Sequence, residues 1–355
     1  MHIIPYSQGS AEWLEWKSTV VGASELAICL GLSPYQTAKQ LFYHKTGLTP
    51  PPDLSRNPHI IRGKKLEPHA RLTTENYFSK KLNQHCLLMP VVAISDEKSL
   101  IGASFDGINL LPDHPMFNIP VELKCPGLTV WNDIQRRGRL STHYIMYAIQ
   151  VQQQIYVAGA KEGYLVFYYQ KNIKVFHIKR DDQFLGYAIP IAENFMRNVL
   201  KITPPADDTE RDIFSPTEDS EITAWQQLRD DYEQNVQQLN AAPNDTTLLQ
   251  KRNQLRDKAV ELLGLYRCGQ IGSFRISRTR PTSKPNHQEQ LTQLLDYIHQ
   301  HNINIPEAIL NTDNFVNTTE SQLRVTTKAK PLTQPQIPSN PNVIKGFEIE
   351  FTPTT

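Results

Sequence analysis

The chain has 355 residues, 39% of them hydrophobic and 21% charged, with a formal net charge of +1, which indicates one large or two ordinary globular domains. No apolar run reaches the roughly 18 to 20 residues of a membrane span, and the N-terminus lacks the pattern of a secretion signal. The cysteines form no CxxC pair, which excludes the common zinc and iron–sulfur motifs. We therefore expect reduced thiols and a cytoplasmic location.

The small net charge conceals a difference between the two parts of the chain. Residues 1–203 carry 22 Lys and Arg against 16 Asp and Glu, a net charge of +6, and residues 204–355 carry the remaining 15 against 20, a net charge of −5. A basic first part permits a polyanionic partner, although ordinary scatter of charge explains the difference equally well. Thr-Pro-Pro at 203–205 marks an expected domain edge.

Helical and extended patterns alternate along the first 203 residues, which predicts an α/β (α+β) domain. Helical patterns cover about 10–17, 23–30, 36–46, 60–82, 129–137, 142–158 and 182–200. Extended patterns cover about 87–95, 99–104, 118–124, 163–170 and 173–179. Ser10 has the side chain of an N-cap, and Pro190 predicts a kink in the helix that contains it.

The expected second region, residues 204–285, begins with two helical patterns. Apolar residues repeat at intervals of three and four over 222–239 and again over 248–262, with Ala-Pro-Asn-Asp between them. This spacing predicts an antiparallel helical hairpin. We expect it to pack on the first domain or on another subunit.

The end of the chain has weaker patterns. Residues 270–280 resemble a strand whose arginines could touch a phosphate backbone. We expect a helical segment over 286–310. Residues 311–355 are rich in Thr, Asn, Pro and Gln, which predicts a disordered tail.

Charged side chains lie on or next to two consecutive predicted strands, 99–104 and 118–124. Asp106 lies in Phe-Asp-Gly, which we interpret as a polar tip closing the preceding strand. Glu122 and Lys124 are two residues apart, so both project from one face of a strand. Carboxylates bind hard cations, bound metals polarise phosphoryl oxygens, and a lysine can orient water. The pattern therefore suits metal-dependent phosphodiester hydrolysis, and a solvated strand face is the alternative.

Glu67 lies beside the apolar stripe of the helix predicted over 60–82, one turn before Arg71. It is either half of a surface pair with that arginine or a further metal or water ligand facing Asp106.

Two further groups of polar side chains could contact a nucleic acid. Arg136, Arg137 and Arg139 end a short helix and are candidates for phosphate binding. Tyr147 and Gln150 lie on a stripe of phenols and amides along the next helix, which can contact phosphates and bases or can simply form a polar surface.

Six segments occur in the order and at the spacings of a known family. They are VVGASELAICLGLSPY at 20–35, RGKKLEP at 62–68, GASFDGI at 102–108, VELKCP at 121–126, YAIQVQQQIYVAG at 147–159 and FHIKRDDQF at 176–184. Over about residues 12–200 the chain resembles the phage lambda exonuclease family, which includes YqaJ-type viral recombinases, within the PD-(D/E)xK nuclease superfamily. The resemblance implies a restriction-endonuclease-like core, with a mixed central β-sheet flanked by helices.

The resemblance also implies roles for particular residues. Asp106 and Glu122 would be the principal metal-binding acids, the backbone carbonyl of Leu123 would add an oxygen, and Lys124 would position or activate the attacking water. Glu67 resembles the helical acid that completes the site, and Gln150 matches a family glutamine near the reacting phosphate. Ser24, preceded seven residues earlier by Lys17, resembles a pair that receives a 5′-phosphate.

The sequence departs from the family pattern in two places. Phe105 stands where the superfamily often has proline, which leaves the metal ligands unchanged. Lys17 stands where an arginine would make a two-pronged phosphate contact, so recognition of the DNA end is expected to be looser.

The implied activity is that of a Mg²⁺-dependent 5′→3′ exonuclease of duplex DNA in phage-type recombination, with Mn²⁺ as a substitute metal. The implied partners are duplex ends, a single-strand annealing protein and further copies of the chain in a ring-like trimer, without a membrane. An endonuclease of the same fold and a catalytically weak DNA-binding or assembly protein are the alternatives. Covalently closed DNA separates the first two, because only an endonuclease cuts it.

Overall fold

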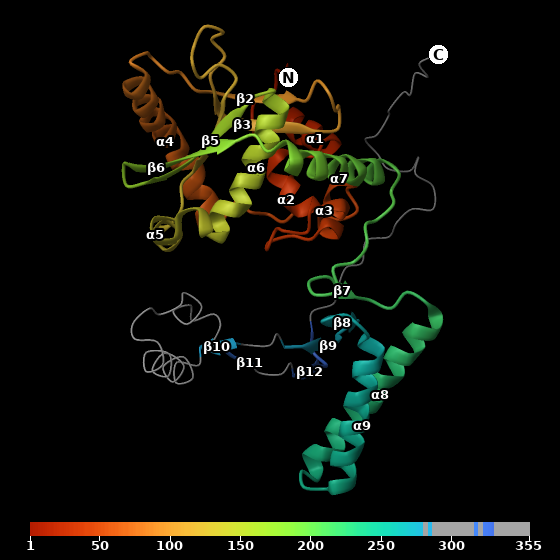
Figure 1. Ribbon diagram of the computed structural model, residues 1–355. Coiled ribbons are helices and arrows are strands. Elements are labelled where there is room, and N and C mark those ends of the chain that lie inside the picture. The colour runs from red at the N-terminus through yellow and green to blue at the C-terminus, as the bar shows by residue number, and fades with distance from the viewer. Residues whose placement is uncertain (280–282, 286–315, 319–321, 330–355) are drawn as a thin grey trace, which may run out of the picture. The chain divides into compact units, whose positions relative to one another are not determined.

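The computed structural model describes residues 1–279, 283–285, 316–318 and 322–329 (Figure 1). The chain divides into two compact units at the Asp207–Asp208 bond, against an edge expected at 203–205. The helical segment expected over 286–310 lies outside the described residues.

A six-stranded sheet forms the centre of the first unit, with the strands in sequence order from β1 to β6. The strands are β1 (His2–Ile4), β2 (Met89–Ile94), β3 (Gly102–Ile108), β4 (Pro120–Lys124), β5 (Glu162–Tyr169) and β6 (Asn172–Lys179). Neighbouring strands are antiparallel except β4 and β5, which are parallel. A parallel pair needs a long crossover, and the helices between β4 and β5 supply it. The predicted mixed sheet is therefore confirmed, and β1 was not predicted.

Helices make up most of the rest of the first unit. They are α1 (Ala11–Thr19), η1 (Ala23–Glu25), α2 (Leu26–Cys29), α3 (Ala38–Lys45), α4 (Pro58–Leu82), α5 (Leu128–Arg137), η2 (Gly138–Leu140), α6 (Thr142–Ala158) and α7 (Asp182–Leu200). The Ser10 side chain accepts a hydrogen bond from Trp13 N, which confirms the predicted cap of α1. The helix expected over 23–30 is instead a 3₁₀ turn followed by one α-helical turn.

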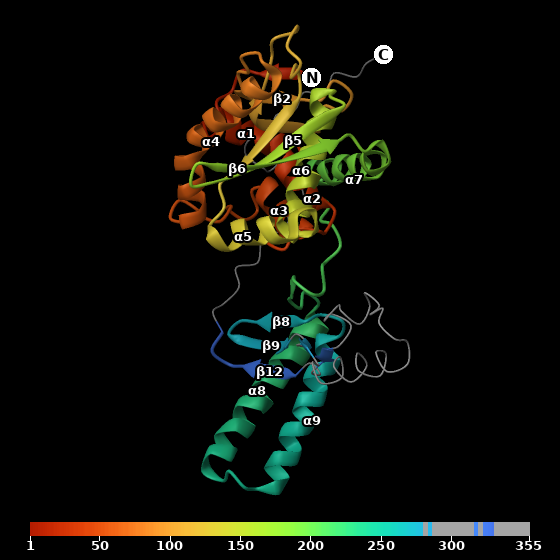
Figure 2. The same ribbon diagram turned by 60° about the vertical axis from the view of Figure 1, so that its left-hand side comes forward.

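Helices α4 and α6 cover opposite faces of the sheet (Figures 1 and 2). Side chains alternate along β5, so Leu165 and Phe167 pack in the cluster that contains the apolar side of α6. Val166 packs with Val121 and Leu123 of β4 in the cluster that contains Ala70 and Phe78 of α4. Residues 122 and 124 therefore face α6.

The second unit pairs a helical hairpin with a small sheet. Its elements are β7 (Ile213–Phe214), α8 (Asp219–Ala241), α9 (Thr246–Leu263), β8 (Cys268–Ile271), β9 (Phe274–Arg278), β10 (Ser283–Pro285), β11 (Val316–Thr318) and β12 (Leu323–Thr326). The four-stranded sheet has the order β12-β9-β8-β7, and β10 pairs with β11.

The predicted hairpin of α8 and α9 is confirmed, but its packing was predicted wrongly. Trp225 and Leu228 of α8 and Leu255 of α9 share a buried cluster with Phe274 and Ile276 of β9. The apolar face of the hairpin is thus covered by the sheet of its own unit.

Two further expectations for this region were wrong. The single strand expected over 270–280 is a β-hairpin, because the chain reverses at Gly272 with a φ of +56°, which favours glycine. Residues 323–326 of the expected disordered tail form β12 and pair antiparallel with β9. Weak local patterns cannot predict such a strand, because its partner lies far away in the sequence. Among the residues that the structure describes, no helix is long and apolar enough for a membrane crossing.

Candidate active site

Asp106 lies inside β3 and does not form the polar tip that the sequence predicted. Met89 pairs with Ile108 and Val91 with Phe105, so one residue of β2 faces two residues of β3, Asp106 and Gly107. This is a β-bulge, which re-aims a side chain without ending the strand. The prediction failed because the glycine after Asp106 was interpreted as a turn.

The Asp106 side chain fills the place where β3 and β4 stop pairing. The two strands pair at Gly107–Val121 and Ile108–Pro120. Beyond these pairs the Asp106 Oδ2 atom accepts a hydrogen bond from the Leu123 backbone N–H at 3.0 Å. The carboxylate therefore replaces a backbone acceptor and lies beside β4, next to Glu122 and Lys124.

Glu122 is buried, with only 1% of its surface exposed, so the solvated strand face considered as an alternative is excluded. Its carboxylate accepts hydrogen bonds from Lys124 Nζ, from Gln150 Nε2 at 2.6 Å and from Gln154 Nε2 at 2.5 Å. Lys124 and Gln150 bond to Oε1, and Gln154 bonds to Oε2. These donors offset the cost of burying the charge and fix the orientation of the carboxylate.

Gln154 belongs to the predicted stripe of phenols and amides, but its role in holding Glu122 was not predicted. It is completely buried, and its amide also donates to the Ser104 carbonyl at 3.2 Å. Gln150 and Gln154 are four residues apart, so both lie on the side of α6 that faces β4. The available signal was a row of amides inside an otherwise apolar helix, because buried amides need hydrogen-bond partners.

Lys124 lies between the acids and Tyr147. Its Nζ atom is 4.6 Å from the centre of the Tyr147 ring, a cation–π arrangement. Burial opposes the charge of Lys124, but the negative charges of Glu122 and Asp106 outweigh it and raise the pKa of the amine. Tyr147, a predicted DNA contact, thus lies under the lysine of the site.

The pKa of the Asp106 carboxyl is raised well above its usual range. Burial is the largest cause, followed by the negative charges of Glu122 and, more weakly, Glu67, whereas Lys124 acts in the opposite direction. Crowded carboxylates disfavour each other's ionisation, so a cation bound here would favour the charged forms.

Glu67 combines features of both predicted interpretations. It pairs with Arg71 Nη2 at 2.5 Å, one turn further along α4. Arg71 Nε in turn donates to the Asp106 carbonyl at 2.7 Å, so the pair lies against the bulge. Glu67 is therefore close enough to influence Asp106, and its role as a metal ligand stays a prediction.

The donor set fits a hard divalent cation such as Mg²⁺. Asp106 and Glu122 offer carboxylate oxygens, and Asp106 Oδ1 accepts no hydrogen bond from any residue that the structure describes. In the described part of the chain, no three His, Cys, Asp or Glu side chains are grouped closely enough to hold a metal by themselves. Mg²⁺ needs no such group, since it is usually bound through one or two carboxylates and keeps several waters.

Lys17 and Ser24 both lie near a buried acid, Glu25. Ser24 is exposed in the short η1, and the expected N-terminal anion site is partly occupied, because Gly22 N–H donates to Glu25 Oε2 at 2.8 Å. Lys17 stacks over the Trp13 ring at 5.1 Å. Burial acts to raise the pKa of Glu25, but the charges of Lys45 and then Lys17 outweigh it and lower the pKa. The role of the pair at a 5′-phosphate stays a prediction.

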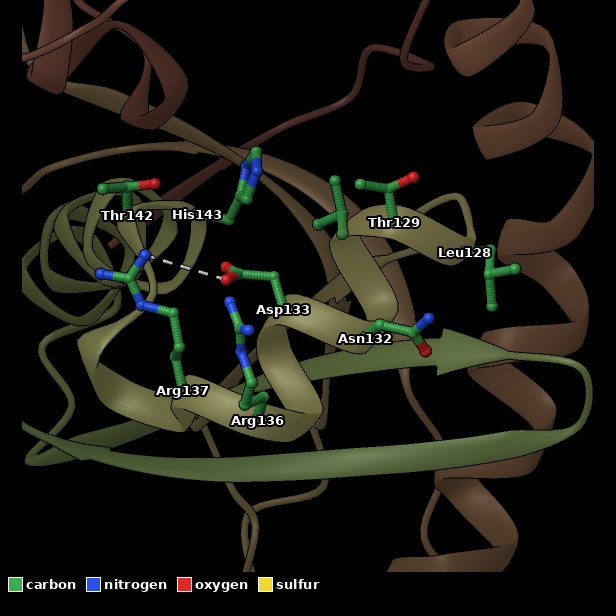
Figure 3. Close-up of a pocket in the computed structure, with 9 residues that line it drawn as sticks. Leu128, Thr129, Asn132, Asp133, Arg136, Arg137, Thr142 and His143 are labelled. Atoms are coloured by element: carbon green, nitrogen blue, oxygen red, sulfur yellow. Dashed lines mark ion pairs between the residues drawn. The ribbon is translucent and has the colours of Figure 1, made fainter. Parts of the chain in front are cut away.

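The predicted phosphate-binding arginines lie around the end of α5 (Figure 3). Arg136 and Arg137 line a pocket between α5 and the start of α6. Arg139 instead donates to the His177 carbonyl at 3.2 Å. The structure therefore separates Arg139 from the other two.

The family comparison agrees with the resemblance inferred from the motifs. Residues 12–161 match the model of the YqaJ-like viral recombinase domain, which confirms the resemblance over this part of the chain. No curated protein matches the sequence.

Solved structures with a similar arrangement include two exonucleases. One is an alkaline exonuclease from Laribacter hongkongensis, with 20% identity and a TM-score of 0.44 over 55% of this chain and 94% of that chain. The other is a phage related exonuclease from Haemophilus somnus 129PT, with 13% identity and a TM-score of 0.36 over 52% and 96% of the two chains.

Proposed function

We propose that the chain is a Mg²⁺-dependent deoxyribonuclease that degrades duplex DNA from a 5′ end. The observation that carries the proposal is the convergence of Asp106, Glu122 and Lys124 at the split between β3 and β4. The YqaJ-like match over residues 12–161 supports the same class of activity.

The proposal gives each residue a role. Asp106 and Glu122, with the Leu123 carbonyl, hold Mg²⁺, for which Mn²⁺ can substitute. When bound, the metal polarises a phosphoryl oxygen and lowers the pKa of a coordinated water. Lys124 orients the attacking water or donates to the phosphate, and its raised pKa keeps it charged at neutral pH. Gln150 holds the Glu122 carboxylate in place.

The wider setting follows from the resemblance and belongs to the same proposal. The substrate is a duplex end whose 5′-phosphate lies near Lys17 and Ser24, and the pathway is phage-type recombination in the cytoplasm. The partners are further copies of this chain, as a trimer, and a single-strand annealing protein.

One digestion experiment tests the proposal. Linear, nicked and covalently closed duplex DNA, with and without 5′-phosphate, are incubated with Mg²⁺ or with EDTA. We expect Mg²⁺-dependent loss of the linear form, faster with a 5′-phosphate, and an intact closed form. Cleavage of closed circles would instead identify an endonuclease, and binding without cleavage would identify a DNA-binding protein.

Matched variants test the residue assignment. Asp106→Asn and Glu122→Gln keep the shape of each side chain and remove its charge, so cleavage should be lost while the fold is retained. Asp113→Asn makes the same change at an exposed loop acid and should leave cleavage unchanged. Full activity in either active-site variant would refute the assignment.

A further inference from the structure

A pocket of about 580 Å³ lies between α5 and the first turn of α6 (Figure 3). Arg136 and Arg137 line it together with His143, and the hydroxyls of Thr129 and Thr142 add neutral donors. Guanidinium and hydroxyl groups of this kind recognise phosphate oxygens.

The only carboxylate among the residues that line this pocket is already engaged. Asp133 accepts a hydrogen bond from Ser141 Oγ at 2.5 Å and faces Arg137 Nη1 at 3.9 Å. Arg136 makes no ion pair with any residue in the described part of the chain, and its side chain is exposed. The pocket therefore has positive charge that its own acid does not neutralise.

The first turn of α5 adds to this positive character. Its N-cap, Gly127, has no side chain to accept a hydrogen bond, and the next residues, Leu128 to Val130, line the pocket. Uncapped N–H groups and the helix dipole favour an anion at this end.

The pocket continues a row of side chains that reaches the catalytic residues. His143, Tyr147, Gln150 and Gln154 are spaced by four, three and four residues, so they form one face of α6. Gln150 and Gln154 hold Glu122, and Tyr147 lies under Lys124. His143 is one turn further on, about 6 Å along the helix axis from Tyr147.

The pocket therefore lies on the same side of α6 as the lysine. The Tyr147 ring lies 4.6 Å from Lys124 Nζ, and His143 at the edge of the pocket is one helical turn beyond Tyr147. A DNA strand that passes Lys124 can therefore reach the pocket.

We propose that the α5–α6 pocket binds a backbone phosphate of the DNA strand being cut, a few nucleotides from the scissile bond, with Arg136 as its main contact. The inference rests on the proposed nuclease function. The pocket would hold the strand in register while the bond at Lys124 is hydrolysed.

The first test measures DNA binding in EDTA, where cleavage does not proceed, as a function of salt concentration. The binding constant falls as salt rises, and each lost phosphate contact makes the slope of log K against log salt less steep by about 0.7 to 0.9. Arg136→Ala should show one such loss, and Arg136→Lys, which keeps the charge, should not. Arg197→Ala is the control, since Arg197 is an exposed arginine on α7 that pairs with Glu193 at 2.7 Å.

The second test locates the phosphate. Single neutral methylphosphonate linkages are placed in turn at about six positions of the cut strand on the 3′ side of the scissile bond. For the wild type, one linkage within a few nucleotides should weaken binding, and in Arg136→Ala the same linkage should have no further effect. Additive losses at every position would overturn the proposal.

The outcomes separate the two proposals. A wild-type protein that binds and cleaves DNA while Arg136→Ala and Arg197→Ala keep the same salt slope refutes the pocket alone. A wild-type protein that neither binds nor cleaves DNA refutes the nuclease function and the pocket together.

Discussion

Gln154 provides the sharpest test of how the site is built. Its Nε2 atom donates to Glu122 Oε2 at 2.5 Å, and both residues are almost completely buried. Gln154→Leu keeps a similar volume and removes the donor. No other recorded hydrogen bond in the described residues reaches Oε2, so this carboxylate oxygen would lose its partner.

The size of the effect follows from the charge on the acceptor. A hydrogen bond to a charged group contributes about 1.5–3 kcal/mol, and loss of a partner that orients a metal ligand typically costs about 10- to 100-fold in metal affinity or activity. We therefore expect the Mg²⁺ concentration for half-maximal nuclease activity to rise by about 10- to 100-fold in Gln154→Leu.

A matched control comes from the same helix. Gln152 donates to the Lys179 carbonyl at 2.7 Å and accepts from Asp181 N–H at 3.1 Å, without a recorded contact to Glu122. Gln152→Leu should lower stability to a similar degree and leave the Mg²⁺ midpoint near the wild-type value. Equal midpoints in the two variants, with both folded by circular dichroism, would show that Gln154 does not position the carboxylate.

Three further outcomes are expected. Burial and then the charge of Glu122 raise the pKa of Asp106 in the folded, metal-free protein. The folded protein therefore gains stability from protonated Asp106 below the unfolded pKa of about 3.9, and it loses this stability as the pH rises through the raised folded pKa. Asp106→Asn should therefore raise the Tm of the metal-free protein near pH 8 more than near pH 4, and Mg²⁺ at about 100 times its Kd should stabilise only the wild type, by about 2.7 kcal/mol. Trp225 is 1% exposed, so Trp225→Ala should destabilise the second unit by about 3–5 kcal/mol and leave the Mg²⁺-stabilised transition in calorimetry unchanged. A Cβ at Gly107 would lie 2.9 Å from Leu88 Cβ, so Gly107→Ala should cost about 1–3 kcal/mol in denaturant unfolding and reduce nuclease activity by distorting the bulge; unchanged activity would separate the bulge from the site.

Local patterns predicted much of the first unit because its elements have strong periodicity. Val121 and Leu123 alternate with Glu122 and Lys124, and this period of two places the acid and the lysine on one face whatever the rest of the chain does. The same reasoning predicted α6 and the α8–α9 hairpin, whose apolar residues repeat every three or four positions.

Other features depended on contacts between distant segments, which no local pattern contains. Glu122 is buried because α6, in the crossover between the parallel strands β4 and β5, covers this part of the sheet. Asp106 reaches β4 through a bulge whose register is set by β2, and residues 323–326 became a strand because β9 offers them an edge. The sequence by itself thus determined which charged groups share a face, since that follows from the backbone repeat. Only the tertiary structure decided that Glu122 is buried, and that two amides and Lys124 hold its carboxylate, because burial depends on which segments pack together.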